Sequence, residues 1–452
     1  MTNLNETDTQ QSPTNPIVNL SQPSGSDSME TATQLKTSAE MSTDQRGCRF
    51  CGEPLEHVVV DLGMSPLCQS QVERDDLNKH EIFYPLRAYV CEKCWLVQVH
   101  EHVAGEEIFS HYAYFSSYSD SWLAHAAAYV DMITERLNLD ETSHVVEVAS
   151  NDGYLLQNFV RKSIPCLGIE PAANVAQVAI DKGIPVDVNF FGVETAKRIA
   201  SEGKSADLLI ANNCLAHVPD LNDFVGGMKQ ILAKGGIVNV EYPHLLNIIE
   251  QNHLDTIYQE HYCYHSLFTL EQVFAHHGMR IFDVEEIPTH GGSLRIYVSH
   301  DDDDAKPVTQ AVHDIRKLEI DRGLTKLETF HAFAERVKET KWNLVEFLIR
   351  ARREGKRVVG YGAPGKGNTM LNYCGIREDL LDFTVDRNPF KQNSFLVGSR
   401  IPVYAPEVID EFKPDYVLIM PWNLRDEIVE QLKHIREWGG QFVVAIPELE
   451  II

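Results

Sequence analysis

A chain of 452 residues is long enough for two or three domains, and an apolar fraction of 43% is ample for buried cores. With 66 Asp and Glu against 40 Lys and Arg, the formal net charge of -26 disfavours a nucleic-acid partner, which is held by neutralising phosphates. No apolar run reaches transmembrane length, and the N-terminus lacks the apolar core of a signal peptide. We therefore expect a cytoplasmic protein without a membrane partner.

The first segment, residues 1–45, is rich in Ser, Thr, Gln and Asn and has few large apolar side chains. Such a segment cannot bury enough apolar surface to offset the entropy lost on ordering. We expect a disordered tail.

Two CxxC pairs, Cys48 with Cys51 and Cys91 with Cys94, follow the tail. Each pair lies in a short turn typical of a zinc knuckle, and two knuckles complete a tetrahedral four-thiolate site. The 39 residues between the pairs exceed the usual spacing, which an inserted strand and loop would accommodate. The pattern predicts one structural zinc, with no open position for catalysis, in a domain spanning 46–105. The alternative is four unrelated reduced thiols.

Residues 143 to about 285 alternate between strand and helix patterns, with apolar strands near 145–149, 165–169, 207–211, 236–241 and 280–285. This rhythm is typical of a doubly wound α/β sheet. The charge block Asp301–Asp304 marks the end of this domain, which we place at 106–304.

The stretch Val145–Leu156, VVEVASNDGYLL, predicts a buried strand, a tight turn and the start of a helix. Open α/β sheets bind ligands at such a turn. The turn is not GxGxxG, and it resembles the first loop of S-adenosylmethionine (SAM) methyltransferases. We expect cofactor contacts after four successive strands, at Glu147, Ser150, Asn151, Asp152, Gly153, Glu170, Asn189, Phe190, Asn212 and Asn213. A lone acidic residue there is often only a cap, but several such loops in register favour a site.

The segment from Tyr258 to His265 concentrates ionisable and aromatic residues. Tyr258, Glu260 and His261 offer a phenol, an orienting carboxylate and a base, which are the parts of proton-transfer chemistry. A polar surface loop is the alternative interpretation. The paired glycines in the motif from His290 to Arg295 allow close approach of the backbone to a ligand.

The remaining chain predicts a helical layer over 306–354 and a second, smaller α/β domain, within a domain spanning 305–452. The run RVVGYGAPGKGN, ending at Asn368, gives a strand, a glycine-rich turn with one lysine, and a helix. This arrangement can cradle a phosphate, although its glycine spacing is not that of a Walker loop. Further strands are expected near 381–385, 415–420 and 441–446.

The order of these parts resembles the SAM-dependent sugar C-methyltransferases of deoxysugar biosynthesis over about residues 46–452. The resemblance rests on the motifs CRFCG, YPLRAYVCEKCWLVQV, EVASNDGYLL, NNCLAHVPDL, YQEHYCYHS, HGGSLRIYV, GYGAPGKGNTMLNYCG and DRNPFKQ. Two departures are visible: Gly365 replaces a usual Ala, and Pro-Leu-Cys-Gln at 66–69 replaces a common Pro-Leu-Ala-Asn.

The resemblance implies a class I methyltransferase domain between a zinc-knuckle domain and a C-terminal Rossmann-like domain, with SAM and one structural zinc as cofactors. It implies methylation of a ring carbon in a nucleotide-linked 4-keto-deoxyhexose, dTDP being the expected nucleotide, through an enolate. His261 would be the base, with Tyr258 as the competing candidate. Glu260 would orient the histidine, and Tyr112 and His217 would hold the keto oxygen.

The same resemblance assigns the nucleotide to the C-terminal domain, whose Lys366 would meet the diphosphate. The expected substrate contacts are His290, Gly292, Ser293, Arg295, Gly362, Lys366 and Asn368. We expect a monomer. The competing interpretations are an O- or N-methyltransferase acting on a sugar or small metabolite, and a non-enzymatic zinc-containing protein that binds a nucleotide sugar. A nucleic-acid methyltransferase is disfavoured by the net charge.

Overall fold

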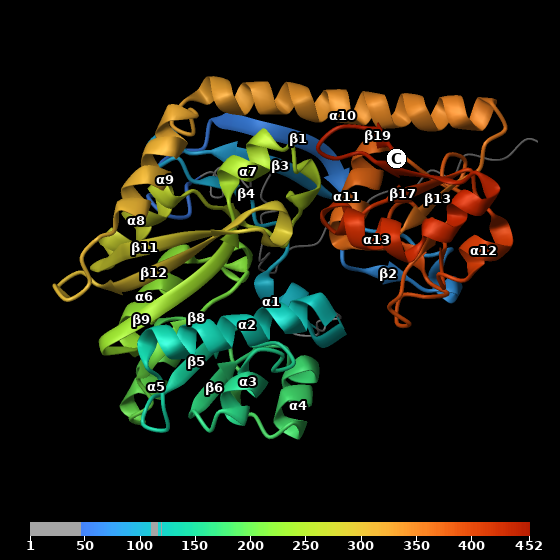
Figure 1. Ribbon diagram of the computed structural model, residues 1–452. Coiled ribbons are helices and arrows are strands. Elements are labelled where there is room, and N and C mark those ends of the chain that lie inside the picture. Colours follow the sequence, from blue (N-terminus) through green and yellow to red (C-terminus); the bar gives the residue numbers. More distant parts are fainter. Residues whose placement is uncertain (1–46, 110–115, 119) are drawn as a thin grey trace, which may run out of the picture. The chain divides into compact units, whose positions relative to one another are not determined.

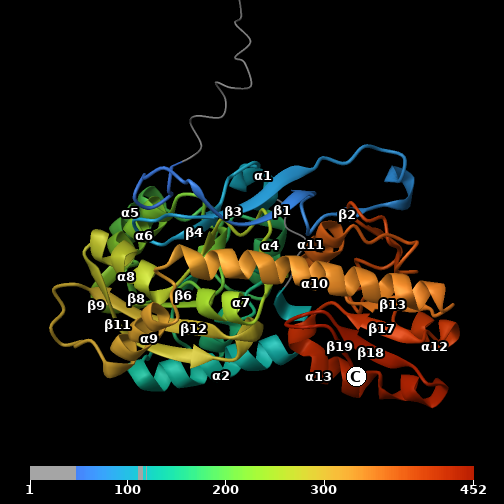
Figure 2. The same ribbon diagram turned by 90° about the horizontal axis from the view of Figure 1, so that it is seen from above.

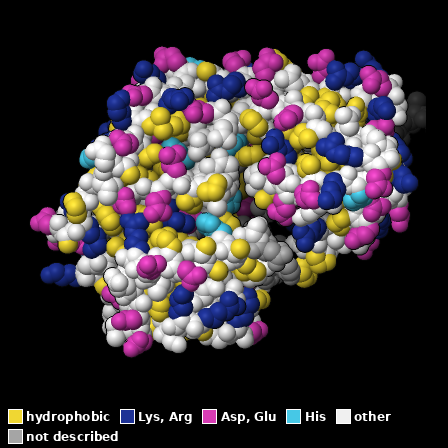
Figure 3. Space-filling view, viewed as in Figure 1, with side chains coloured by type: hydrophobic (Ala, Val, Ile, Leu, Met, Phe, Trp, Pro, Cys, Tyr) yellow, Lys and Arg dark blue, Asp and Glu magenta, His cyan; other side chains and the backbone are white. Residues whose placement is uncertain are grey.

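The computed structural model describes residues 47–109, 116–118 and 120–452 (Figure 1). The predicted tail and Tyr112 lie outside these residues. Contacts gather Asp44–Ile452 into one compact unit, so the domain boundaries placed at 105 and 304 stay predictions. Acidic and basic side chains are interspersed on the face drawn in Figure 3.

The N-terminal sheet has the order β1-β3-β4-β10 and is antiparallel. Its strands are β1 (His57–Ser65), β3 (Tyr84–Val90), β4 (Val97–Val99) and β10 (Cys263–Tyr264). The second cysteine pair forms the turn between β3 and β4. The fourth strand, β10, comes from the segment beside Tyr258 and His261, so the cysteine-bearing sheet is hydrogen-bonded directly to the predicted catalytic loop.

The central sheet has the order β11-β12-β9-β8-β5-β6-β7. Its strands are β5 (Val145–Val148), β6 (Cys166–Ile169), β7 (Val186–Asp187), β8 (Ala206–Ile210), β9 (Leu232–Pro243), β11 (Met279–Ile287) and β12 (Ser293–His300). The first five are parallel, whereas β12 is antiparallel to both β9 and β11. The strands predicted near 145–149, 165–169, 207–211, 236–241 and 280–285 correspond to β5, β6, β8, β9 and β11. The chain reverses there through η5 (Thr289–Gly291), which holds the His-Gly-Gly motif.

Helices cover both faces of this sheet. Val145 and Leu208 face a core formed with α2 (Asp120–Leu137) and α3 (Leu156–Arg161). Val146 and Leu209, one residue further along each strand, face the opposite core, formed with α5 (Val193–Ser201), α6 (Leu221–Ile231) and α8 (Leu267–His276). Because successive strand side chains point to opposite faces, an uninterrupted apolar run is what a sheet covered on both sides requires. Shorter helices are α1 (Gly105–Phe109), α4 (Ala173–Asp181) and α7 (Leu245–Glu250).

The C-terminal sheet has the order β16-β14-β13-β17-β18-β19, parallel except for β19. Its strands are β13 (Val358–Tyr361), β14 (Thr384–Val385), β16 (Val403–Tyr404), β17 (Tyr416–Ile419), β18 (Gln441–Val444) and β19 (Glu450–Ile451), with helices α11 (Gly365–Cys374), α12 (Val408–Phe412) and α13 (Arg425–Gln431). A separate pair joins β2 (Gln71–Val72) to β15 (Phe395–Leu396).

The predicted helical layer consists of α9 (Gln310–Asp321) and α10 (Leu327–Arg353). The long helix α10 packs on β1, α7, α11 and β13 and so links the two α/β regions (Figure 2). Its outer face is charged, and none of the helices in the described ranges is both long and apolar enough to cross a membrane.

Candidate active site and zinc centre

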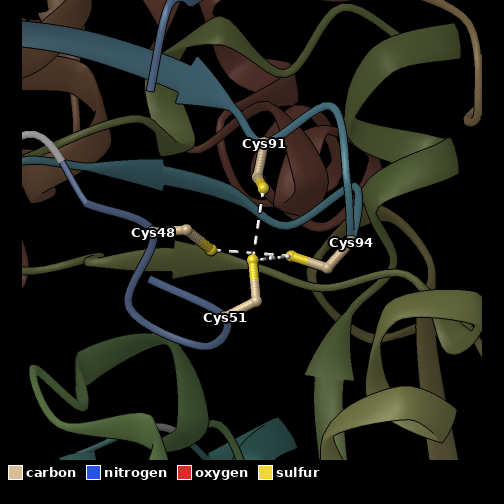
Figure 4. Close-up of side chains that lie close together, drawn as sticks. All are labelled: Cys48, Cys51, Cys91 and Cys94. Atoms are coloured by element: carbon tan, nitrogen blue, oxygen red, sulfur yellow. Dashed lines mark hydrogen bonds between the residues drawn. The ribbon is translucent and has the colours of Figure 1, made fainter. Parts of the chain in front are cut away.

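The four predicted cysteines converge on one point (Figure 4). Their sulfur atoms lie within 4.8 Å of one another, with Cys48–Cys94 and Cys51–Cys91 separations of 3.5 Å. Four thiolates bound tetrahedrally at a usual Zn–S distance of about 2.3 Å would be about 3.8 Å apart. The set therefore fits a closed zinc site, and the alternative of unrelated thiols is wrong.

The two knuckles adopt the same kind of backbone turn. Gly52 and Trp95, the residues after each second cysteine, have positive φ angles of 76° and 64°. In each turn the amide of that residue donates to the carbonyl of the first cysteine, Cys48 or Cys91, at 2.9 and 2.8 Å. The Gln98 amide donates to the Cys48 sulfur at 3.2 Å, which stabilises a thiolate there.

The loop after β5 gathers acidic groups at the carboxyl end of the central strand. Glu147 and Asp152 are 1% and 2% exposed, and each has a carboxylate oxygen without a hydrogen-bond partner among the described residues. Burial, with repulsion from Glu170 and Asp152, raises the pKa of Glu147 well above its usual value. A cationic ligand would compensate the repulsion between these carboxylates. The residues therefore fit SAM, which carries an ammonium and a sulfonium.

The loop's shape depends on unusual backbone angles. Ala149, Asn151 and Gly153 have positive φ, and a Cβ on Gly153 would lie 2.3 Å from Ile184. Glu170 fastens the loop: one oxygen accepts from the Asn151 amide at 3.0 Å and the other from the Ala172 amide at 2.9 Å. Each of these oxygens keeps a lone pair for a ribose hydroxyl.

The other predicted cofactor residues differ in burial and in whether their polar groups already have partners. Asn213 lies after β8 with its side-chain amide unpartnered within the described part of the chain, whereas the Asn212 amide oxygen accepts from the Glu241 backbone at 3.2 Å. Asn189 and Phe190 are exposed after β7, where an adenine could lie. Ser150 is fully buried beside Gly168, and its hydroxyl has no hydrogen-bond partner among the described residues.

Tyr258 and His261 form a hydrogen-bonded pair whose proton positions follow from the geometry. The Nδ1 of His261 lies 2.8 Å from the Thr256 carbonyl oxygen, which only accepts, so Nδ1 carries the hydrogen. In the neutral ring Nε2 then holds the lone pair, and the Tyr258 hydroxyl donates to it at 2.7 Å. Burial, followed by repulsion from His217, lowers the pKa of His261 well below its usual value, so the ring is neutral at physiological pH.

The prediction that Glu260 orients His261 needs correction, because the Thr256 carbonyl holds Nδ1 and Tyr258 holds Nε2. Glu260 is buried in the adjacent turn. The His217 ring centre lies 4.7 Å from that of His261, and burial lowers the pKa of His217 to about 4. Tyr112 falls outside the described residues.

Lys366 at the start of α11 faces this pair from the C-terminal domain. Its Nζ donates to Asn423 at 2.9 Å and lies 4.8 Å from the Trp422 ring centre. Burial lowers the pKa of Lys366, opposed by the nearby charge of Asp255. The positive charge of Lys366 also contributes to lowering the pKa values of His261 and His290. The predicted base and two of the predicted substrate contacts, His290 and Lys366, are therefore close enough to interact electrostatically.

Several predicted substrate contacts are instead committed to internal structure. Arg295 donates to Glu241 and Glu285 at 2.6–3.0 Å and is not free to bind a phosphate. The Ser293 hydroxyl donates to the Thr289 carbonyl at 2.9 Å, and Asn368 donates to the Cys68 carbonyl at 3.0 Å. A Cβ on Gly292 would lie 2.3 Å from Asn247 and one on Gly362 would lie 2.6 Å from Pro421, so both glycines permit close packing.

The sequence prediction missed four groups. Thr256 acts through a backbone carbonyl, which leaves no mark in a sequence. Asp255 and Trp422 lie beside Lys366, and His125 donates to the buried Glu241 at 3.1 Å. The Trp in the Pro-Trp-Asn turn after a strand was the available signal.

An acidic cofactor loop on this sheet order, together with a closed four-sulfur site, defines a SAM-dependent methyltransferase with a structural zinc site. Three family models match in succession: a zinc binding domain over 48–109, a methyltransferase domain over 122–284, and the C-methyltransferase C-terminal domain over 288–447. The chain is 35% identical to C-methyltransferase NovU of Streptomyces niveus over 405 residues, which cover 90% of this chain and 96% of NovU. It belongs to the SAM-dependent C-methyltransferase family, as the sequence motifs predicted.

Solved structures with a similar stretch include a SAM-dependent methyltransferase of Anabaena variabilis, which is 16% identical with a TM-score of 0.32 and covers 39% of this chain and 84% of its own. Another is the magnesium protoporphyrin IX methyltransferase of Synechocystis with bound SAM, which is 12% identical with a TM-score of 0.30 and covers 40% and 81%.

Proposed function

We propose that the enzyme methylates a ring carbon of a nucleotide-linked 4-keto-deoxyhexose, with dTDP as the nucleotide. The observation that carries this proposal is the Tyr258–His261 pair, because attack from carbon requires a base that removes the C–H proton beside the ketone. The relative NovU, a C-methyltransferase, supports attack from carbon.

The pair supports a relay in which two protons move together. The Tyr258 oxygen takes the proton from the carbon beside the ketone while its own hydroxyl hydrogen passes to Nε2 of His261. The electrons of the C–H bond would form the enolate; SAM, when bound, would supply the methyl group to the enolate carbon while the methyl–sulfur bond breaks and S-adenosylhomocysteine leaves. The His217 ring lies beside His261, and its Nδ1 has no hydrogen-bond partner among the described residues, so it is suited to the keto oxygen. The lowered pKa of His261 favours release of the proton after turnover.

Lys366 supports a phosphorylated handle on the sugar. It is a cation at the first turn of α11, a ten-residue helix whose N-terminus has no side-chain cap. Cation and helix N-terminus both favour an anion such as a diphosphate. Binding energy from that remote group can position the sugar at the reacting centre.

The proposal is tested by incubating the enzyme with SAM and a panel of dTDP-4-keto-deoxyhexoses. We expect a mass gain of one CH₂ with the new methyl bonded to carbon by NMR, and deuterium uptake from solvent beside the ketone. Tyr258→Phe should lower both rates by about 10²–10⁴-fold. Tyr404→Phe, on β16, is the matched control and should leave them unchanged.

Two results would contradict the proposal. A product methylated on oxygen or nitrogen would replace it with the heteroatom reaction. Full deuterium exchange by Tyr258→Phe, but none by His261→Asn, would keep the reaction and make His261 the direct base.

A further inference from the structure

The short helix η4 (Leu254–Thr256) contacts His261 on one side and the C-terminal domain on the other. On one side, the Thr256 carbonyl accepts from Nδ1 of His261 at 2.8 Å. On the other, the Asp255 carboxylate accepts from the indole Nε1–H of Trp422 at 2.8 Å. Consecutive residues of one turn therefore contact the catalytic histidine and the domain that carries Lys366.

The turn is rigid enough to transmit a displacement. The Thr256 hydroxyl and amide both donate to the His253 carbonyl, at 2.8 and 3.1 Å. Asp255 is fully buried, so its hydrogen bond to Trp422 forms in a low-dielectric setting where such a bond is strong. α11 also packs on η4.

The Trp422 indole packs against His253 and the backbone at Gly291. The Trp422 and His253 ring centres are 4.2 Å apart, and a Cβ on Gly291 would lie 2.6 Å from Trp422. These contacts, together with the hydrogen bond to Asp255, hold the indole N–H toward the carboxylate. One Asp255 oxygen has no hydrogen-bond partner among the described residues, and the other accepts from Trp422.

We propose that the Trp422–Asp255 hydrogen bond is a positioning link through which the C-terminal domain, which would hold the substrate's anionic handle, aligns His261 as the proton acceptor for Tyr258. This inference rests on the proposed function. Trp422 and Asp255 act through Thr256 and His261 and are positioning residues.

The test is Trp422→Phe, which removes the indole N–H and keeps a ring against His253 and Lys366. A hydrogen bond to a charged group is strong enough that we expect kcat and deuterium exchange to fall by at least about tenfold. The substrate KM and the SAM Kd should change by less than about twofold, because their contacts remain. The matched control is Trp438→Phe, whose indole donates to the Pro414 carbonyl at 3.0 Å, away from the site; it should behave as wild type.

The ¹⁵N NMR signals of the His261 ring distinguish a positioning role from a merely structural one. These signals are assigned as the ones that disappear in His261→Asn. Wild type should show the hydrogen on Nδ1, and Trp422→Phe a mixture of tautomers. Asp255→Ala should give the same loss, and the double variant no further loss, because both changes break one link. Additive losses, or a Trp422→Phe enzyme with wild-type kcat and tautomer, would overturn the inference. If wild type accepts no nucleotide sugar, the proposed function fails, and the tautomer comparison still decides the link.

Discussion

Two loops in this chain share one local fold and differ in charge. Each follows a strand with parallel neighbours on both sides, β5 in the central sheet and β13 in the C-terminal sheet, and each leads into a helix. The loop after β5 gathers Glu147, Asp152 and Glu170, whereas the loop after β13 leads to Lys366. Backbone topology thus sets where a ligand can bind, and side-chain charge selects its sign.

The backbone amides of the two loops are used differently as well. In the first loop the Glu170 carboxylate accepts from Asn151, and acidic oxygens of Glu147 and Asp152 stay unpartnered in the described part of the chain. In the second, Asp386 accepts from the Ala363 amide at 2.7 Å, so only the amides at the start of α11 remain for an anion. The glycine-rich sequence therefore offers a smaller phosphate cradle than its glycine count indicates.

Replacing the cation is the largest test of this contrast. Lys366→Met should raise the KM for the nucleotide sugar by about a hundredfold, since a charge-assisted contact contributes about 2–3 kcal/mol. SAM affinity should not change, because the acidic loop is intact. Steady-state kinetics and calorimetric SAM titration measure the two. Lys356→Met, which removes an exposed ion pair with Asp415, is the control. Equal losses for both ligands would refute the division of labour.

The reciprocal test is Asp152→Asn, which keeps the side chain's shape and removes its charge. We expect SAM to bind about tenfold more weakly, because one carboxylate no longer compensates the ligand's positive charge. Affinity for the nucleotide sugar should be unchanged when measured without SAM. Calorimetry measures both affinities. Asp181→Asn, which changes an exposed residue of α4, is the control and should bind both ligands as wild type does. Unchanged SAM binding would mean that this carboxylate does not meet the cofactor.

The raised pKa of Glu147 gives a smaller, pH-dependent effect. Above the usual value of 4.5 the unfolded chain has lost this proton while the folded protein still holds it, so stability falls as pH rises. Between about pH 5 and 8 the melting temperature of the SAM-free enzyme should therefore fall more for wild type than for Glu147→Gln. SAM should reduce the difference between them. If the melting temperatures of the two proteins fall equally with pH, the pH dependence does not come from Glu147.

The sequence predicted those parts of the fold that depend on neighbouring residues. The buried run at 145–149 became β5, the periodic segment 306–354 became α9 and α10, and two CxxC turns converged on a zinc centre. In each case the signal is local, because strand burial, helical period and knuckle spacing are properties of a few consecutive residues.

Contacts between distant residues could not be predicted in this way. Arg295 is a plausible anion ligand by type, and only the fold shows that it pairs with Glu241, 54 residues away. The Trp422–Asp255 bond spans 167 residues, and the Thr256 carbonyl is a backbone atom that every residue type offers. The candidate site was therefore predicted at Tyr258, His261 and Lys366, and its supporting contacts were not.

The last comparison concerns the glycines of the two loops, where the expected effect is on stability rather than on ligand binding. Gly153 has a positive φ of 75° and would place a Cβ 2.3 Å from Ile184, so Gly153→Ala combines backbone strain with a clash and should cost about 2–3 kcal/mol of unfolding free energy. Gly365 has no such φ; its Cβ would meet Gln69 at 2.8 Å and Cys68 at 3.0 Å. Gly365→Ala should therefore cost only about 1 kcal/mol, because the end of the Gln69 side chain can move.

The contact also joins the two departures from the family pattern, Gly365 and the Cys68-Gln69 pair, in one place. A small residue on α11 then makes room for larger ones in the 66–69 loop. Denaturant unfolding of Gly365→Ala combined with Gln69→Asn should recover most of the lost stability, whereas Gln69→Asn should not rescue Gly153→Ala. If the double variant is no more stable than Gly365→Ala alone, the two departures are independent, and the glycine at 365 is needed for the anion site rather than for packing.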